Sequence, residues 1–297
     1  MMARLLEAVR PESRLVLVGD ADQLASVEAG AVLADMVEGL ASMPDSPVAR
    51  LATSHRFGAS IDTLAKAIKA GDAEAAIEVL SAGGEHLEWV NTHQPADVLR
   101  QVLVPQALLL REAALLDDAD AALAVLEQHR MLCAHRKGPY GVTHWNRQIE
   151  RWLAEQTDAP LWAQWYPGRP VLVTANDYGL KLYNGDTGVT IRQRGALRAV
   201  MATATGPVDF ATSRLADIET MHAMTIHKSQ GSQAAEVTVL LPPEDSRLLT
   251  RELLYTAVTR ARTKVRVVGS AEQLRAAVAR RAARATGLSR RLRETME

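Results

Sequence analysis

Short runs of consecutive apolar residues, each followed by a polar or glycine-containing turn, constrain this chain more than any other feature. The run at residues 15–18 (Leu-Val-Leu-Val) ends at Gly19-Asp20, and residues 131–134 form a run of the same kind. Residues 237–241 and 265–268 are further expected strands, each apolar except for one residue, Thr238 and Arg266. Such runs are typical of strands buried on both faces of a helix-covered parallel sheet. We therefore predict an α/β protein with a parallel sheet and flanking helices.

Helical periodicity fills most of the chain between these runs. Ile61, Leu64, Ala65 and Ile68 recur at i, i+3, i+4 and i+7, which predicts a helix with one buried stripe. Ser270 followed by Gln273 predicts a capping box at the start of the last helix. Further helices are expected at about residues 30–40, 95–129, 146–154 and 250–261.

The spacing of the apolar residues changes from helical to β-like between residues 169 and 215. Short β-like segments are expected at residues 171–173, 181–183, 189–191 and 199–201. They are separated by turn signals at Asn184-Gly185, Gly195 and Gly206-Pro207. Closely spaced short strands predict a small β-barrel or sheet inserted into the α/β domain.

Composition limits where the chain can act. Net charge is −1, so any contact with nucleic acid must come from local patches. Cys133 is the only cysteine, which excludes an intramolecular disulfide and favours a reducing compartment such as the bacterial cytoplasm. No run approaches the roughly 20 apolar residues of a membrane span. For the basic tail at residues 275–293, a solvated helix face is favoured over phosphate or partner binding.

Two polar clusters follow predicted strands, where ligands bind in open α/β sheets. In residues 19–24, the Gln23 amide can both donate and accept, so it can sense a terminal phosphate or its attacking water; the alternative is a turn in which Asp22 caps a helix. In residues 225–232, hydroxyls, His227 and Lys228 are donors suited to phosphate oxygens, and Gly231 allows close backbone approach. The alternative there is an ordinary polar loop.

A third cluster lies on the predicted helix at residues 250–261. Its buried stripe is expected to leave Thr256, Thr259 and Arg260 on other faces. An arginine held on a rigid helix can stabilise the charge of a transferring phosphoryl group; the alternative is a surface ion pair. Arg56, in Ser-His-Arg-Phe at residues 54–57, is a weaker candidate for phosphate contact. The expected stripe comprises Leu253, Leu254, Ala257, Val258 and Ala261.

In this order, the clusters resemble the later motifs of RecD-type superfamily 1 helicases, the family of the exodeoxyribonuclease V alpha subunit. The resemblance implies RecA-like domains of the P-loop NTPase type and an inserted SH3-like β-barrel that touches single-stranded DNA. Residues 1–46 would be a remnant of the first RecA-like domain, residues 47–168 and 219–297 the second, and residues 169–218 the insert. The resemblance is carried by residues 14–36, 54–57, 165–171, 176–177, 182–186, 225–232 and 250–262.

The resemblance also implies roles for individual residues. Gln23, Arg56 and Arg260 would be catalytic, sensing the γ-phosphate or stabilising its charge. The implied DNA-binding residues are Thr225, His227, Lys228, Ser229 and Asn176. The implied ATP-binding residues are Asp20, Gln23, Arg56, Gly231, Gln233 and Arg260. The family usually has glutamate where Gln233 stands, and this difference weakens any ribose or base contact there.

The implied activity is that of an ATP- and Mg²⁺-dependent 5′–3′ DNA helicase in double-strand break repair and recombination. Its partners would be DNA, a helicase-nuclease beta subunit and a scaffold gamma subunit. The sequence holds neither a Gly-x-x-x-x-Gly-Lys-Ser/Thr P-loop nor an Asp-Glu pair for magnesium, so the chain alone is expected to be inactive, as a C-terminal part of a longer protein. Two alternatives remain open: a stand-alone helicase of the same type, and a non-catalytic DNA-binding paralogue.

Overall fold

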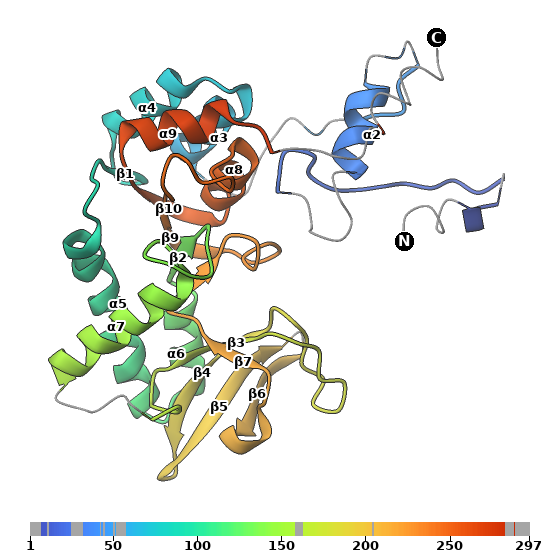
Figure 1. The fold of residues 1–297 in the computed structure, drawn as a ribbon. Coiled ribbons are helices and arrows are strands. Elements are labelled where there is room, and N and C mark those ends of the chain that lie inside the picture. Colours follow the sequence, from blue (N-terminus) through green and yellow to red (C-terminus); the bar gives the residue numbers. More distant parts are fainter. Residues whose placement is uncertain are drawn as a thin grey trace.

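Two five-stranded sheets organise the chain, one parallel and one antiparallel (Figure 1). They are seen in a computed structural model. The structure describes residues 7–10, 12–24, 32–41, 43, 45–49, 51, 58–157, 163–203, 205–282 and 288. The helices and strands confirm the predicted α/β class with a parallel sheet and flanking helices.

The first sheet is parallel throughout, with strand order β1-β10-β9-β2-β8. Three of its strands coincide with predicted strands, because a strand covered on both faces is mostly apolar along its length. The strands are β1 (Leu87–Val90), β2 (His129–Cys133), β8 (Ala223–Thr225), β9 (Ala234–Leu240) and β10 (Ala261–Val268).

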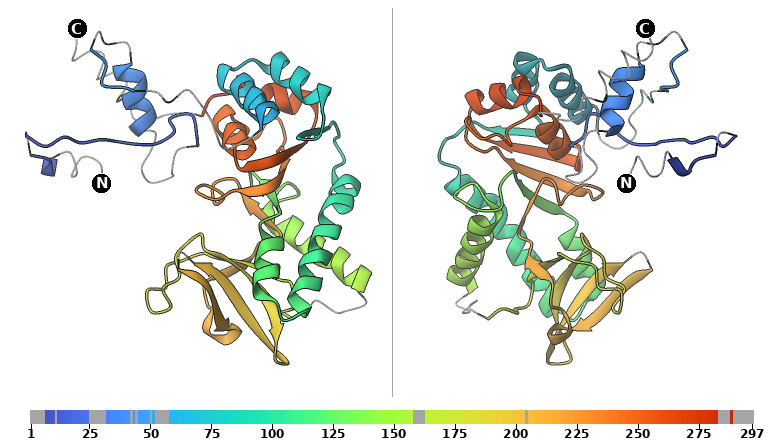
Figure 2. Two further views of the ribbon diagram at one scale, coloured as in Figure 1. Left: turned by 180° about the vertical axis from the view of Figure 1, so that it is seen from behind. Right: turned by 45° about the vertical axis from the view of Figure 1, so that its right-hand side comes forward.

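Helices cover both faces of this sheet (Figures 1 and 2). Leu132, Val239 and Val267 face a core shared with α3, α4, α8 and α9, while Met131, Leu240 and Val268 face α5 and α7. The predicted stripe on α3 is confirmed, since all four of its residues are buried. The helices are α3 (Ala59–Ala70), α4 (Ala73–Ala82), α5 (Ala96–Leu115), α7 (Val142–Thr157), α8 (Arg251–Val258) and α9 (Ala271–Ala279). The predicted capping box begins α9.

The second sheet is antiparallel, with order β6-β5-β4-β3-β7, and lies in sequence between α7 and β8. It packs against α5 and α6 (Ala119–Leu126) and has its own core around Val171, Met201 and Phe210. The predicted inserted β segment is therefore confirmed as a sheet. Its strands are β3 (Pro170–Val173), β4 (Thr187–Gln193), β5 (Ala196–Thr203), β6 (Gly206–Ala211) and β7 (Ile218–Thr220), with the short helix η1 (Thr212–Arg214) before β7.

Two predicted strands are wrong. Residues 15–18 form no strand, and Val16 and Val18 are 69% and 90% exposed. A strand buried on both faces needs neighbouring strands, and the described residues supply none to this run. Residues 181–183 belong to a tight loop, in which Lys181 has φ of 56° and Leu182 makes only an isolated bridge to Asp177. The predicted helix near residues 30–40 is present as α2 (Val32–Leu40).

Gly168 fixes the contact between α5 and the antiparallel sheet. Its φ is +83°, and a Cβ there would lie 2.6 Å from the Arg111 Cα of α5. Gly195, in the β4–β5 turn, has a similar φ of +82° but nothing within 4 Å of such a Cβ. Gly195→Ala is expected to lower the free energy of unfolding by about 1–2 kcal/mol through backbone strain alone. Gly168→Ala should cost about 1–3 kcal/mol more through overpacking.

Urea unfolding of both variants measures this difference. Equal loss in the two variants would contradict a close approach of α5 to Gly168.

Candidate functional site

Residues 20–24, the first predicted cluster, lie against α8 and the loop after β8. The Leu24 N–H donates to Thr256 Oγ1 at 2.7 Å, and the Gln230 side-chain amide donates to the Leu24 carbonyl. The Tyr255 hydroxyl donates to Asp20 Oδ2 at 3.3 Å. These contacts span more than 200 residues of sequence and bring all three predicted clusters together.

Gln23 and Arg260 each donate to a residue of this contact. The Gln23 amide donates to Asp20 Oδ2 at 2.9 Å. Arg260 Nε donates to the Thr256 carbonyl at 3.1 Å, and Nη1 donates to the Ser232 carbonyl at 3.3 Å. Thr256 thus binds the chain next to Gln23 through its hydroxyl and binds Arg260 through its carbonyl.

The expectation that Thr256, Thr259 and Arg260 lie on faces away from the buried stripe is wrong. Thr256 is 0%, Thr259 3% and Arg260 6% exposed. Thr256 lies in α8, while Thr259 and Arg260 follow its last residue, Val258. The helix is covered on nearly every side because α3, α9, the parallel sheet and residues 20–24 all contact it. The expected stripe itself is buried as predicted.

Burial and charge keep Tyr255 in its hydrogen-bonding form. Burial raises the pKa of its hydroxyl well above the usual value, the carboxylates of Asp20 and Asp22 raise it further, and Arg260 lowers it. Tyr255 is therefore a neutral donor at physiological pH. Asp22 forms an ion pair with Lys69 of α3. Both carboxylates of the segment are thus held by neighbouring side chains.

Gly231 and Gln233 complete this region. Gly231 has φ of +85° and open space where a Cβ would be, so its backbone is accessible. The Gln233 amide points to the Thr259 carbonyl at 3.5 Å. Within the described residues, no group of three or more His, Cys, Asp or Glu side chains is arranged to hold a metal ion. Arg56 lies outside the described residues.

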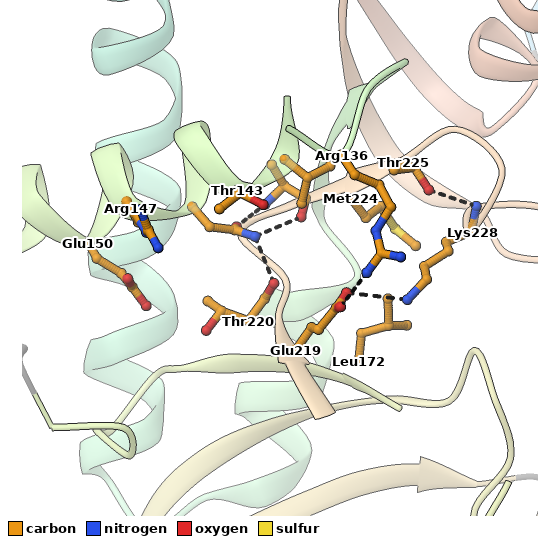
Figure 3. A pocket seen from close by; sticks show the side chains of 13 residues that line it. Arg136, Thr143, Arg147, Glu150, Leu172, Glu219, Thr220, Met224, Thr225 and Lys228 are labelled. Carbon is orange, nitrogen blue, oxygen red and sulfur yellow. Dashed lines mark hydrogen bonds and ion pairs between the residues drawn. The ribbon is translucent and has the colours of Figure 1, made fainter. Parts of the chain in front are cut away.

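A separate groove of about 270 Å³ lies where the two sheets meet (Figure 3). Arg136 follows β2, Arg147 comes from α7, and Lys228 comes from the loop after β8; all three line the groove. Glu219 binds two of these cations, Arg136 Nη2 at 2.6 Å and Lys228 Nζ at 3.3 Å (Figure 3). Three cations and two carboxylates, Glu219 and Glu150, thus line the groove, so its lining carries a net positive charge.

Two of the five predicted DNA-binding residues line this groove, and the other three do not. Thr225 and Lys228 line it, and the Lys228 N–H donates to Thr225 Oγ1 at 3.2 Å. Ser229 is buried and donates to the Ile226 carbonyl at 2.7 Å. His227 is half-buried, and burial lowers the pKa of its imidazole. Asn176 lies in the β3–β4 loop, where its Oδ1 accepts from the Asn184 N–H at 2.8 Å.

Sequence reasoning missed several groove residues. Arg136 was detectable in principle, because it precedes Lys137 and Gly138 at the carboxyl end of a predicted strand. Arg147, Thr143 and Glu219 gave no such signal. The Asn146 amide also went unnoticed: it donates to the Thr220 carbonyl and accepts from the Ala223 N–H, which fixes the β7–β8 connection to α7.

The chain is similar in sequence to proteins of known families. A model described as the UvrD-like helicase C-terminal domain matches residues 220–268, and one described as an AAA domain matches residues 1–92. RecBCD enzyme subunit RecD of Mycolicibacterium smegmatis is 68% identical over 293 residues, which cover 99% of this chain and 52% of that protein. Over nearly its whole length, the chain is therefore similar to one part of the RecD subunit.

The chain spans about half the length of the RecBCD enzyme RecD subunits that it resembles. ATP-dependent RecD2 DNA helicase of Deinococcus radiodurans is 32% identical over 99% of this chain and 38% of that protein. Among solved structures, Pif1 helicase from Bacteroides matches with a TM-score of 0.39 and 14% identity, covering 76% of this chain and 53% of that one. None of the helices in the described ranges combines the length and apolar character that a bilayer span requires.

Proposed function

We propose that this chain is the C-terminal part of an ATP-driven DNA helicase, the RecD-type subunit of a RecBCD enzyme (exodeoxyribonuclease V) that acts in double-strand break repair and recombination. The single observation that carries the proposal is the docking of residues 20–24, which include Gln23, on Thr256 of α8, the residue whose carbonyl also binds Arg260. In this proposal, residues 1–46 belong to a first RecA-like domain, residues 47–168 and 219–297 form a second, and residues 169–218 form an SH3-like insert.

The proposed nucleotide site uses two donors that already bind acceptors within the chain: Arg260 binds backbone carbonyls and Gln23 binds the Asp20 carboxylate. Arg260 is held by backbone carbonyls at 3.1 Å and 3.3 Å. A γ-phosphate oxygen carries negative charge, and charge-assisted hydrogen bonds are roughly twice as strong as neutral ones. The guanidinium is therefore expected to leave these carbonyls for the phosphate, while Gln23 exchanges Asp20 for the phosphate or its attacking water.

The donor set fits a triphosphate but not its magnesium. The carboxylates of Asp20 and Asp22 are held by Gln23, Tyr255 and Lys69, and the sequence has no Asp-Glu pair. In our proposal, the described residues sense and stabilise phosphate charge and supply no metal ligand. Magnesium and the remaining phosphate contacts would come from a segment with a P-loop.

The loop after β8 provides a physical link between nucleotide and nucleic acid. Gln230 contacts Leu24, and the Ser232 carbonyl holds Arg260. At the other end of the same loop, Thr225 and Lys228 line the basic groove. If Arg260 moves to a phosphate, it releases Ser232, and the groove end of the loop can shift with it. This arrangement supports the proposal that binding and hydrolysis of ATP change how tightly the chain binds a DNA strand.

Substitutions in the groove provide the first test of this proposed function. We propose that DNA phosphates replace Glu219 as partners of Arg136 and Lys228. Arg136→Ala and Lys228→Ala are each expected to weaken single-stranded DNA binding and to reduce the slope of log affinity against log salt by about 1. Lys264→Ala is the matched control, because Lys264 pairs with Glu88 on β1. Unchanged slopes in both groove variants would remove the groove from DNA binding.

The identity of the partners is a second part of the proposal. The 68% identity to a RecBCD subunit, against 32% to the RecD2 helicase, favours a subunit that works with RecB- and RecC-type partners over a stand-alone helicase. Co-purification of the chain with such partners tests this choice. Recovery of the chain without them would favour the stand-alone alternative.

A further inference from the structure

Glu219 occupies two of the cations that the groove would offer to a strand. Its Oε1 accepts from Arg136 Nη2 at 2.6 Å, and its Oε2 accepts from Lys228 Nζ at 3.3 Å (Figure 3). Each carboxylate oxygen therefore binds one cation. A phosphodiester also carries one negative charge shared by two oxygens, so Glu219 presents to these cations the same kind of group that a strand would bring.

The backbone around Glu219 fixes this carboxylate at the groove. Glu219 pairs with Leu172 in the β3–β7 ladder. The next residue, Thr220, is held twice: its carbonyl accepts from Asn146 Nδ2 at 2.8 Å, and its Oγ1 accepts from Arg169 Nε at 2.9 Å. A group tethered in this way has a high effective concentration at its site, so an incoming phosphate must compete with it.

The ion pairs of Glu219 can be displaced because they are open to solvent. The side chains of Arg136 and Glu219 are 68% and 42% exposed. Ion pairs between exposed side chains are screened by water and salt and contribute little to stability. The other carboxylate of the groove, Glu150, accepts from the Tyr166 hydroxyl at 2.9 Å and forms no ion pair with any described residue. Glu219 is therefore the carboxylate that a strand would have to displace.

We propose that Glu219 is a built-in competitor, which limits the affinity of the groove for the phosphates of a nucleic acid strand and hastens release of the strand. This inference rests on the proposed function and adds a residue that regulates it. While no strand is bound, Glu219 occupies Arg136 and Lys228, so each binding event must displace it. As a strand leaves, Glu219 returns to the same cations and opposes rebinding. A protein that moves along a strand must release phosphates as well as bind them.

The variant Glu219→Gln removes the charge with little change in size, and it should bind more tightly than wild type. Fluorescence anisotropy of a labelled single-stranded oligothymidylate, at low salt on the 297-residue chain, is expected to show a Kd roughly 10-fold lower, because two exposed ion pairs no longer compete. Most of this gain should lie in the dissociation rate. Glu155→Gln is the matched control: Glu155 lies on α7, pairs with Arg100 at 2.9 Å and does not line the groove, so Kd should stay near wild type. Damage to the fold cannot mimic a gain in affinity.

A mutant cycle separates competition for the cations from general repulsion of the strand. When Arg136→Ala and Lys228→Ala are both present, Glu219 has neither cation to occupy, so adding Glu219→Gln should change Kd little. An undiminished gain in that background would mean that Glu219 merely repels the strand, and it would overturn the proposal.

The remaining outcomes separate this inference from the proposed function. If Glu219→Gln binds no more tightly than wild type, the built-in competitor is overturned, while DNA binding by the groove stands on the salt slopes of the Arg136 and Lys228 variants. If neither wild type nor Glu219→Gln binds the oligonucleotide, the proposed function fails and this inference fails with it. Tighter binding by Glu219→Gln that disappears when both cations are removed supports the proposal.

Discussion

Replacing Arg260 with alanine is expected to slow ATP hydrolysis about 10³-fold or more in an ATP-hydrolysing protein that contains this chain. The proposed reason is that its guanidinium stabilises charge that develops on the transferring phosphoryl group, a role worth about 10³–10⁵ in rate. Binding of ATP should change little, because most of the binding contacts lie elsewhere. Steady-state kcat and an equilibrium nucleotide-binding assay measure the two effects separately.

Two matched variants control this prediction. Arg262 lies two residues farther along on β10 and is paired at 3.8 Å with Glu127, so Arg262→Ala should leave kcat near wild type. Arg260→Lys keeps the charge but loses the fork geometry, and should recover only part of the rate. Because Arg260 is buried, the unfolding free energy of each variant must be compared as well. A wild-type kcat in Arg260→Ala would remove this residue from the mechanism.

Acid should destabilise the folded chain strongly between pH 6.5 and pH 4.5. Burial, together with nearby arginines, lowers the pKa of both His129 and His222 from 6.5 to about 3. The arginines are Arg266 and Arg130 beside His129, and Arg169 beside His222. In the unfolded chain each imidazole takes up a proton near pH 6.5. Their contribution to stability is therefore complete above that pH and is lost progressively as the pH falls toward 3.

The size of this loss of stability follows from the linkage between proton binding and folding. Each histidine costs about 1.4 kcal/mol per pH unit once the unfolded state binds its proton, so the two together cost about 4 kcal/mol at pH 5. Native domains have only about 5–15 kcal/mol of stability. Urea unfolding at pH 7, 6 and 5 measures the slope, and His129→Gln or His222→Gln should each reduce it by one proton. An unfolding free energy that stays constant over this range would contradict the buried, neutral state of both imidazoles.

Local patterns in the sequence predicted much of the fold. The stripe on α3, the buried strands β2, β9 and β10 and the capping box of α9 all depend on residues close together in the chain. The failures depend on distant residues. Residues 15–18 lack neighbouring strands, and the exposed faces expected for α8 are covered by segments that no helical period reveals.

The site was predictable to the same extent. The sequence indicated that residues 20–24, 225–232 and 255–262 belong together, and hydrogen bonds join them as expected. It did not indicate the groove, because Arg136, Arg147 and Glu219 meet only after the antiparallel sheet folds between α7 and β8. Nor could it show that Ser229 would be buried against the Ile226 carbonyl.

A double-mutant cycle on Gln23 and Arg260 tests the central claim most directly. The measured quantity is kcat for ATP in a protein that contains this chain, for Gln23→Ala, Arg260→Ala and the double variant. If both side chains act on one triphosphate, the two losses must be strongly non-additive, with the double variant close to the worse single variant. Losses in activation free energy that simply add would mean that the two residues act independently and share no nucleotide.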